Sequence, residues 1–455
     1  MIVSSAFRDK RYVVLGLARS GMATVEALLA SDAAEVIAWD RRPGPREELA
    51  RRATIADPLA IDLRGLDGIV LSPGVPLNTH PLAAKAREAG VPLIGDVELF
   101  AQARQDLPAH QVVGITGTNG KSTTTALLHH LLVDAGRPAL MGGNIGLPIL
   151  AQEPLPEGGT YVLELSSYQI DLTFSLRCDA AALTNITPDH LDRYDGFAAY
   201  AASKARLFAL QDPAQFAVFG CEDAATAEIY RTEMARRPDD RARPVDYQAW
   251  QPHQPEWPSL QGPHNLQNAA IAASIALELG LSREEVLAGL ASFRGLAHRM
   301  ERLGEFGGVL FVNDSKATNP ASTAPALAAW PPNPEKRVHW ICGGLPKGDD
   351  LDECAPAFGN IAAAYTIGEA GPRFAELLEP HMRVERCEML CEAVQRSIVA
   401  ARPGDVVLFS PACASFDQFR DYEQRGDCFR KLVLQLTGAA TTEASPAACN
   451  ASPAA

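Results

Sequence analysis

The sequence lacks the features that mark membrane-embedded, secreted or disulfide-bonded proteins. It contains no run of about 18 apolar residues, so we expect no membrane span. Its first residues lack the order of charge, apolar core and small-residue cleavage site of a signal peptide, and we therefore expect a cytoplasmic protein. Nine cysteines are scattered from Cys178 to Cys449 without a C-x-x-C pair, a pattern that favours reduced thiols over a disulfide framework or a zinc site.

An excess of positive charge is also missing. The formal net charge of −14 argues against a general nucleic-acid-binding protein, although anionic small ligands need only a local cluster of donors. Apolar residues make up 47% and charged residues 21% of the chain, as in ordinary globular proteins. A chain of 455 residues is too long for one hydrophobic core, so we expect several domains.

Strand-like and helix-like segments alternate along most of the chain, which predicts α/β domains built on parallel sheets. We expect a Rossmann-like domain at residues 1–100, a central phosphate-loop ATPase-like domain at 101–300 and a second Rossmann-like domain at 301–436. Residues 437–455 carry almost no large apolar side chain and are expected to form a disordered tail. Residues 231–258 are rich in Arg, Asp, Pro and Trp and are expected to form an irregular surface excursion. The expected strands are 12–16, 36–40 and 68–74, then 161–165 and 180–184, then 309–312, 338–342 and 406–410.

The most specific motif is GITGTNGKST at residues 114–123, which lies between a short apolar strand and a segment with helical apolar spacing. Glycines in such a loop let backbone N–H groups turn toward phosphate. Lys121 can reach the β- and γ-phosphates, and the hydroxyl of Ser122 or Thr123 can bind Mg²⁺. The common loop has glycine where Ile115 stands, so this is a specialised version. The motif predicts an ATP site.

The first domain has a weaker nucleotide signature. Residues 16–21 form a glycine turn between a strand and a helix, but Ala18 stands where a dinucleotide fingerprint needs its second glycine. Asp40 ends the next strand, where a ribose or base contact is expected, and Arg41 and Arg42 add positive charge. A nucleotide site is favoured here, and a purely structural Rossmann-like unit is the alternative.

Polar residues also follow strands of the central domain. Glu164 ends an apolar strand about forty residues past the phosphate loop, where it can serve as a Mg²⁺ ligand or hold a water, or remain a solvated carboxylate. Residues 187–194 place His190 among several ionisable groups after another strand. Lys204, by its periodicity, is expected to be an exposed helix lysine.

Three polar clusters follow strands of the last domain. They are residues 313–319, residues 343–348 with Lys347, and residues 410–419 with Ser415. Turns alone do not require so many polar side chains at strand ends, so we expect a ligand site there.

Together these motifs resemble the bacterial Mur ligases of peptidoglycan precursor synthesis, over nearly all of the chain up to about Leu436. The phosphate loop and residues 189–194 are shared across that family, as are His264-Asn265 with Asn268. Residues 313–319 and 410–419 resemble its D-glutamate-adding members. Phe416 and Tyr422 depart from the pattern, since we expect an aliphatic residue and Phe at these two positions.

The resemblance implies an ATP-dependent amide ligase with UDP-N-acetylmuramoyl-L-alanine and D-glutamate as substrates. ATP would phosphorylate the alanyl carboxylate, and the amine of D-glutamate would attack the acyl phosphate to form a tetrahedral intermediate. The family likeness also implies two Mg²⁺ sites, a cytoplasmic monomer, and no nucleic-acid partner. The residues themselves leave open whether D- or L-glutamate is the acceptor.

The resemblance assigns roles to individual residues. Lys121 would neutralise the γ-phosphate, Ser122 and Glu164 would serve one Mg²⁺, and His190 with a Lys204 carbamylated by CO₂ would form the second metal site. This role replaces the exposed-lysine interpretation of Lys204. The expected ATP contacts are Gly117, Thr118, Asn119, Gly120, Lys121, Ser122, Thr123, Asn268, Arg299 and Asp314. The expected UDP-substrate contacts are Ser20, Asp40, Arg41, Arg42, Gly74 and Asn144, and the expected D-glutamate contacts are Lys347, Thr318, Ser415 and Phe416.

Four rival interpretations explain less of the sequence. Folylpolyglutamate synthases share the phosphate loop but lack the N-terminal nucleotide unit, and the sister ligases of the family differ at residues 313–319. An NAD-dependent oxidoreductase would explain the first domain but not Gly-Lys-Ser-Thr. A regulatory nucleotide switch would not need three ligand-rich domains.

Overall fold

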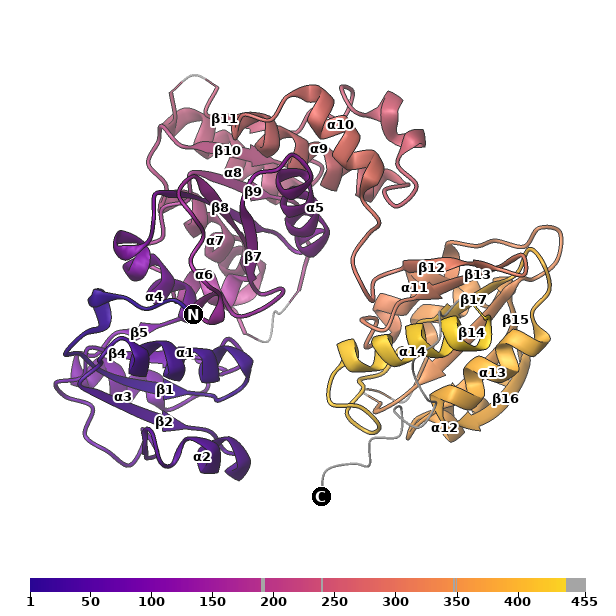
Figure 1. Cartoon of the computed structure of the whole chain (residues 1–455), viewed down its shortest axis with the longest axis horizontal. Helices are drawn as coiled ribbons and strands as arrows, with labels where there is room; N and C mark the ends of the chain where they lie inside the picture. Colours follow the sequence, from indigo (N-terminus) through magenta and orange to yellow (C-terminus); the bar gives the residue numbers. More distant parts are fainter. Residues whose placement is uncertain (190–192, 239, 347, 349, 439–455) are drawn as a thin grey trace. The chain divides into compact units, whose positions relative to one another are not determined.

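The computed structural model describes residues 1–189, 193–238, 240–346, 348 and 350–438. The chain divides into two compact units, Met1–Phe293 and a second unit that begins at Arg294 (Figure 1). The first unit contains a five-stranded and a six-stranded sheet, and the second contains one six-stranded sheet. The predicted α/β class with parallel sheets is confirmed, whereas the domain boundaries at residues 100 and 300 remain predictions.

The first sheet has five parallel strands in the order β3-β2-β1-β4-β5. Its central strand β1 (Arg11–Leu15) buries four of its five side chains. Gly16 follows β1 with φ +89°, and a Cβ there would lie 2.8 Å from the Cβ of Ser72, so this turn requires glycine. The remaining elements are β2 Glu35–Trp39, β3 Thr54–Ile55, β4 Gly68–Leu71, β5 Leu93–Ile94, α1 Arg19–Ala30, α2 Pro43–Leu49, α3 Leu82–Ala89 and α4 Asp96–Ala103.

The second sheet has six parallel strands in the order β11-β10-β9-β6-β8-β7. The carboxyl ends of β6 (His110–Thr116), β8 (Gly159–Glu164) and β9 (Ala180–Leu183) meet at one edge, where ligands bind in sheets of this kind. The other strands are β7 Ala139–Gly143, β10 Phe216–Phe219 and β11 Ala242–Pro244. The helices are α5 Lys121–Asp134, α6 Ser167–Asp171, α7 Gly196–Ala209, α8 Ala224–Arg236, α9 Pro263–Glu278 and α10 Arg283–Ser292.

The irregular excursion that we predicted at residues 231–258 is partly wrong. Helix α8 extends to Arg236, and Asp223 caps its first turn by accepting from the backbone N–H of Thr226 (2.8 Å). Strand β11 then joins the edge of the second sheet, and the segment ends in a 3₁₀ helix, Gln251–Glu256.

The third sheet has the order β12-β13-β17-β14-β15-β16, with only β12 antiparallel to its neighbour. Alternate residues of its central strands enter two separate cores: Val312, Trp340 and Leu408 pack on one face, and Ile341 and Val407 on the other. The strands are β12 Glu301–Phe306, β13 Val309–Asn313, β14 Val338–Gly343, β15 Ile361–Ile367, β16 Arg383–Glu388 and β17 Val406–Phe409. The helices are α11 Pro320–Ala328, α12 Gly371–Leu378, α13 Leu390–Ala400 and α14 Tyr422–Leu436.

Short 3₁₀ helices complete the elements: Ser5–Phe7, Arg104–Asp106, Ile149–Ala151 and Asp352–Asn360, besides the one at Gln251–Glu256. Within the described residues, no helix combines the length and apolar character needed to cross a bilayer. The predicted tail lies outside the described residues except for its first two positions, 437 and 438.

Candidate active site

The phosphate loop between β6 and α5 is shaped by two glycines. Gly117 has φ +145°, and a Cβ there would lie 1.9 Å from the hydroxyl oxygen of Thr184. Gly120 has φ +83°, and its Cβ would lie 2.3 Å from Oδ1 of Asn268. Neither a left-handed backbone nor such close packing admits a side chain. The loop is therefore held against the end of β9 and against α9.

Lys121, the first residue of α5, folds back over this loop. Its Nζ donates hydrogen bonds to the backbone carbonyls of Gly117 (3.0 Å) and Thr118 (2.8 Å). Ser122 beside it is buried. A cation and a hydroxyl thus lie at a helix N-terminus, where the backbone N–H groups favour phosphate.

Lys204 reaches the same loop from α7, and the exposed position expected from its spacing is wrong. Its side chain is buried, and its Nζ donates to the carbonyl of Gly117 (2.7 Å) and lies 4.6 Å from the centre of the Tyr200 ring. Burial and then the positive charge of Lys121 lower the pKa of Lys204 to about 7, against the opposing effect of nearby carboxylates. A large share of Lys204 is therefore neutral amine near neutral pH.

Glu164 offers a carboxylate oxygen that no donor satisfies. It ends β8 and is 2% exposed, and its Oε1 accepts a hydrogen bond from Nδ2 of Asn144 (2.9 Å). Its Oε2 is buried and has no hydrogen-bond partner among the described residues. An unsatisfied buried oxygen is costly unless a cation or water meets it, so this position fits a Mg²⁺ ligand.

The expected metal ligands are an unusual set. Among the residues that the structure describes, no group of three or more His, Cys, Asp and Glu could hold a metal ion. Two members of the expected set, Ser122 and Lys204, are of other types, and His190 lies outside the described residues. Mg²⁺ prefers oxygen ligands, so Lys204 fits such a site only after it gains an oxygen donor.

The first unit contains a cavity of about 240 Å³ that is lined by residues of both of its α/β domains. It brings together Ser20 of α1 and Asn144 after β7, both of which we predicted as UDP-substrate contacts. Arg19 donates from Nη2 to the carbonyl of Gly146 (3.4 Å) across this cavity. Asp96 also lines it, and burial raises the pKa of Asp96 to about 6. The remaining lining residues are Ala18, Pro73, Gly143, Gly146, Pro148 and Gln169.

The other predicted UDP-substrate residues do not line this cavity. Asp40 accepts hydrogen bonds from the backbone N–H groups of Leu17 (2.7 Å) and Arg42 (2.9 Å) and pairs with the guanidinium of Arg42. Burial acts to raise the pKa of Asp40, but these donors and the charge of Arg42 hold it at about 2. Arg41 and Gly74 lie at the surface. Asp40 thus orders the loop after β1, and its contact with a nucleotide remains a prediction.

Sequence reasoning missed an aromatic cluster beside this cavity. The guanidinium of Arg193 lies 4.4 Å from the centre of the Tyr168 ring, and Tyr168 stacks on Tyr194 with ring centres 5.9 Å apart. Arg193 also donates to the carbonyl of Val75 (2.9 Å), 118 residues away in sequence. The polarity of residues 189–194 indicated a site in the sequence. The contact with Val75 that positions Arg193 could not be seen there.

In the second unit, the predicted polar clusters follow β13, β14 and β17 at one edge of the sheet. Asp314 is buried, and it accepts hydrogen bonds from the hydroxyl of Ser410 (2.7 Å) and the backbone N–H of Met300 (3.1 Å). Burial raises the pKa of Asp314 to about 7. A Cβ on Gly344 would lie 2.4 Å from the carbonyl of Ala414, so these two loops touch. The described parts of the three clusters therefore lie side by side.

The predicted amino-acid contacts differ in burial. Ser415 is buried, Thr318 is half-buried, and the ring of Phe416 is 69% exposed. Lys347 lies outside the described residues. Tyr422 departs from the expected Phe, and its extra hydroxyl accepts a hydrogen bond from Nζ of Lys316 (3.0 Å).

Of the predicted ATP contacts, Asn268 is buried beside the phosphate loop in the first unit, whereas Arg299 and Asp314 belong to the second.

Comparisons with known proteins cover almost the whole chain. Residues 115–276 match the Mur ligase middle domain, and residues 298–413 match the Mur ligase glutamate ligase domain. The chain is 67% identical to a UDP-N-acetylmuramoylalanine–D-glutamate ligase of Novosphingobium aromaticivorans, with 96% of this chain and 97% of that protein covered. The chain belongs to the Mur ligase family. The resemblance inferred from the motifs is thereby confirmed.

Other relatives agree with this family. The chain is 58% identical to a UDP-N-acetylmuramoylalanine–D-glutamate ligase of Sphingopyxis alaskensis, covering 96% of this chain and 100% of that protein. Its fold is similar to that of UDP-N-acetylmuramate–alanine ligase from Thermotoga maritima, with a TM-score of 0.56, 17% identity, and coverage of 94% and 99%. This likeness in fold confirms the predicted three-domain α/β architecture.

Arg425 of α14 holds two of the C-terminal clusters together, and sequence reasoning missed it. Its side chain is 1% exposed. Its guanidinium donates to the hydroxyl (3.1 Å) and carbonyl (2.8 Å) of Ser315 and to the carbonyls of Ala414 (2.9 Å) and Cys413 (3.0 Å). Burial lowers the pKa of Arg425 to about 10, so the residue stays charged near neutral pH. Its partners lie 11 to 110 residues away, so the local sequence carries no signal for this role.

Proposed function

We propose that the chain is an ATP-dependent ligase that adds D-glutamate to UDP-N-acetylmuramoyl-L-alanine in cytoplasmic peptidoglycan precursor synthesis. The observation that carries the proposal is the 67% identity over 436 residues with a protein named for that reaction. A second support is the phosphate loop, because Lys121 and Lys204 both donate to the carbonyl of Gly117.

The chemistry explains why ATP is consumed. A carboxylate is a poor electrophile, and its phosphorylation gives an acyl phosphate with a good leaving group. The amine of D-glutamate attacks this carbonyl, and the tetrahedral intermediate collapses to an amide and inorganic phosphate. The protein contributes mainly charge neutralisation and positioning.

The phosphate loop supplies the charge neutralisation. When ATP binds, Nζ of Lys121 gives up its hydrogen bonds to the loop carbonyls and contacts the γ-phosphate instead. The backbone N–H groups of residues 117–123 bind the other phosphates. Asn268, Arg299 and Asp314 hold the rest of ATP.

The metal chemistry rests on Glu164, Ser122, Lys204 and His190. When bound, Mg²⁺ supplies positive charge to the phosphate oxygens. Glu164 and Ser122 would hold one ion, and carbamylated Lys204 with His190 would hold the other. In carbamylation the neutral Nζ of Lys204 forms a bond to the carbon of CO₂, one C=O π bond opens to leave an anionic oxygen, and the nitrogen releases a proton to water, so a neutral amine becomes an anionic oxygen donor. A pKa of about 7 suits this step because only the neutral amine attacks CO₂.

The UDP-substrate and D-glutamate use other parts of the chain. Ser20, Asn144 and Gly74, with the ordered loop of Asp40, Arg41 and Arg42, bind the UDP-substrate. Lys347, Thr318, Ser415 and Phe416 bind D-glutamate. We propose that the chain works as a cytoplasmic monomer, and sedimentation velocity tests that oligomeric state. The cysteines that the structure describes are free thiols, as expected in a reducing compartment.

The reaction predicts that phosphate release depends on both substrates. With ATP and Mg²⁺, release should require UDP-N-acetylmuramoyl-L-alanine and D-glutamate together, and L-glutamate should support far less. A coupled phosphate assay with each substrate omitted in turn measures this. Robust ATP turnover with neither substrate would refute the ligase assignment, and equal turnover with L-glutamate would refute the stereochemistry.

Replacing Arg425 with methionine should destabilise the protein and weaken acceptor binding. The change removes four buried hydrogen bonds of the guanidinium, to the hydroxyl and carbonyl of Ser315 and to the carbonyls of Cys413 and Ala414, so we expect a loss of about 2–4 kcal/mol in the free energy of unfolding. The KM for D-glutamate should rise more than kcat falls, because the loops of Ser315 and Ala414 lose their common anchor. Denaturant unfolding and steady-state kinetics measure the two effects.

Arg373→Met is the matched control for that variant. Arg373 belongs to the same unit but is exposed, and among the described residues its one ion pair is with Glu376, so its loss should change stability by less than about 1 kcal/mol. An unchanged KM for D-glutamate in Arg425→Met would contradict a positioning role for Arg425.

A further inference from the structure

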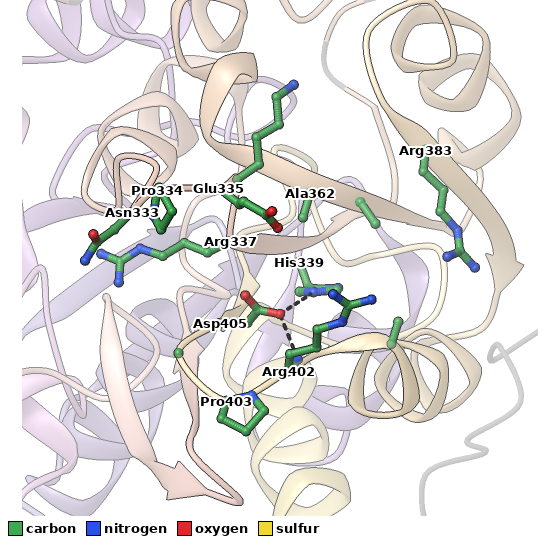
Figure 2. Close-up of a pocket in the computed structure, with 14 residues that line it drawn as sticks. Asn333, Pro334, Glu335, Arg337, His339, Ala362, Arg383, Arg402, Pro403 and Asp405 are labelled. Atoms are coloured by element: carbon green, nitrogen blue, oxygen red, sulfur yellow. Dashed lines mark hydrogen bonds and ion pairs between the residues drawn. The ribbon is translucent and has the colours of Figure 1, made fainter.

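A second cavity in the C-terminal unit lies apart from the residues assigned to the ligase reaction. It has a volume of about 500 Å³, within the range of small-molecule sites. Its lining includes the cations Lys336, Arg337, Arg383 and Arg402, the carboxylates Glu335 and Asp405, and His339. Figure 2 shows His339 and Asp405 close together, with Arg402 beside them.

The position of this cavity separates it from the candidate active site. Arg337 and Asp405 directly precede β14 and β17, and Arg383 begins β16. The cavity therefore lies at the amino-terminal edge of the third sheet. Asp314 and Ser410 lie at the opposite edge, about 20 Å away along a six-residue strand.

The charge of the cavity is opposite to that of the chain. Its four Lys and Arg residues exceed its two carboxylates, Glu335 and Asp405, which gives a formal +2 (4 − 2) with His339 neutral, whereas the chain carries −14. Burial lowers the pKa of His339, although the Asp405 carboxylate opposes this, so the neutral ring dominates near neutral pH. A local excess of cations in an acidic protein attracts anions.

The carboxylate of Asp405, at the floor of the cavity, already accepts hydrogen bonds from the protein. Asp405 accepts hydrogen bonds from the backbone N–H of Arg402 (2.7 Å) and from Nε2 of His339 (3.2 Å), as Figure 2 shows. The other ring nitrogen of His339 lies 2.9 Å from the hydroxyl of Tyr365. His339 is buried, so this chain of contacts forms a fixed polar floor.

Two of the four cations have no partner among the residues that the structure describes. Within the described part of the chain, the side chains of Lys336 and Arg402 form no hydrogen bond or ion pair, whereas Arg383 pairs with Glu385 (2.5 Å) and Arg337 donates to a backbone carbonyl. Four other exposed arginines of this unit pair with acids, although Arg294 and Arg302 form no ion pair within the described residues. The four pairs are Arg373–Glu376, Arg386–Glu379, Arg396–Glu392 and Arg420–Asp421.

We propose that this cavity, centred on Lys336, Arg402 and His339, binds a small phosphorylated molecule. Lysine and arginine both bind phosphate oxygens, as a point charge and as a planar fork of donors. The walls of Ala362, Ala363 and Pro403 leave room for a compact organic group beside the phosphates.

Binding of labelled inorganic pyrophosphate to the full-length protein tests the proposal. Equilibrium dialysis is run with Mg²⁺ and a saturating non-hydrolysable ATP analogue, so that the phosphate loop is filled. We expect one pyrophosphate per chain, and Lys336→Glu combined with Arg402→Glu should weaken binding about 100-fold, about tenfold for each lost cation. The charge-matched control, Arg373→Glu with Arg386→Glu, should bind as the unchanged protein does.

Three results would overturn the proposal: no pyrophosphate bound by the unchanged protein, equal binding by the cavity variant, or an equal loss in the control. Hydrogen exchange on the unchanged protein gives a test that needs no variant to fold. Pyrophosphate should slow exchange of the backbone amides at residues 402–406, and no change there would also refute the site.

Discussion

Replacing Lys204 with alanine is expected to lower the rate of phosphate release by about 10³-fold, or about 4 kcal/mol in the activation free energy. The change removes the residue that would carry the oxygen donor of the second metal site. It also removes one of the two lysine donors to the carbonyl of Gly117 within the phosphate loop. Steady-state phosphate release with saturating substrates measures the loss.

Two companion experiments separate the carbamate from the positive charge. Lys204→Arg keeps a cation but cannot take up CO₂, because a guanidinium is not deprotonated near neutral pH. It should be as inactive as Lys204→Ala. Short-chain carboxylic acids should restore part of the activity of Lys204→Ala, where they replace the missing anion, but none to Lys204→Arg. Full activity in either variant would refute the carbamate role.

The low pKa of Lys204 also predicts how CO₂ uptake depends on pH in the protein without Mg²⁺ and nucleotide. Below pH 7 the amine is protonated and does not react, so uptake should rise between roughly pH 6 and pH 8. The unmodified protein should gain stability as pH rises from about 7 toward 10.5, the ordinary lysine value. In that range the unfolded chain holds a proton that the folded chain has lost. Carbon NMR with labelled CO₂ and unfolding at several pH values measure both trends.

The sequence predicted those features of the site that depend on neighbouring residues. The strand, glycine loop and helix around residues 114–123 are local, and the glycines that the motif required occupy the positive-φ positions 117 and 120. Glu164 was predicted at a strand end because hydrophobic runs mark where buried strands stop, and it ends β8.

Features that depend on distant contacts were not predictable. Lys204 has the spacing of a surface residue, and only the packing of α7 on a loop 87 residues away buries it. Arg425 lies in α14, a helix with many charged residues. Its role comes from contacts with the loops of Ser315 and Ala414, which the fold of the sheet brings to it. Asp40 was expected to face a nucleotide, but its carboxylate is engaged by Leu17 and Arg42. In each case tertiary packing determines which groups the side chain contacts, and the local sequence does not show this.

Replacing Lys121 with methionine should lower kcat by about 10³-fold, because the γ-phosphate would lose its neutralising cation in the transition state. The same variant should change the chemistry of a second residue. The charge of Lys121 is the second cause, after burial, of the low pKa of Lys204. Removing it should raise the pKa of Lys204, so CO₂ uptake should move to higher pH than in the unchanged protein. Lys431→Met removes an exposed lysine elsewhere and should leave both the rate and the uptake profile unchanged.

The paired measurement distinguishes a coupled site from two independent lysines. If the CO₂ profile of Lys121→Met matches that of the unchanged protein while kcat falls, the two lysines do not interact, and burial alone sets the pKa of Lys204. If both kcat and the CO₂ profile change, Lys121 has two linked roles in the phosphate loop. Lys121 then neutralises the transferred phosphoryl group, and it also keeps Lys204 neutral enough to take up CO₂ before the metal binds. The link between the two roles follows from the closeness of the two lysine side chains, which share the carbonyl of Gly117 as an acceptor.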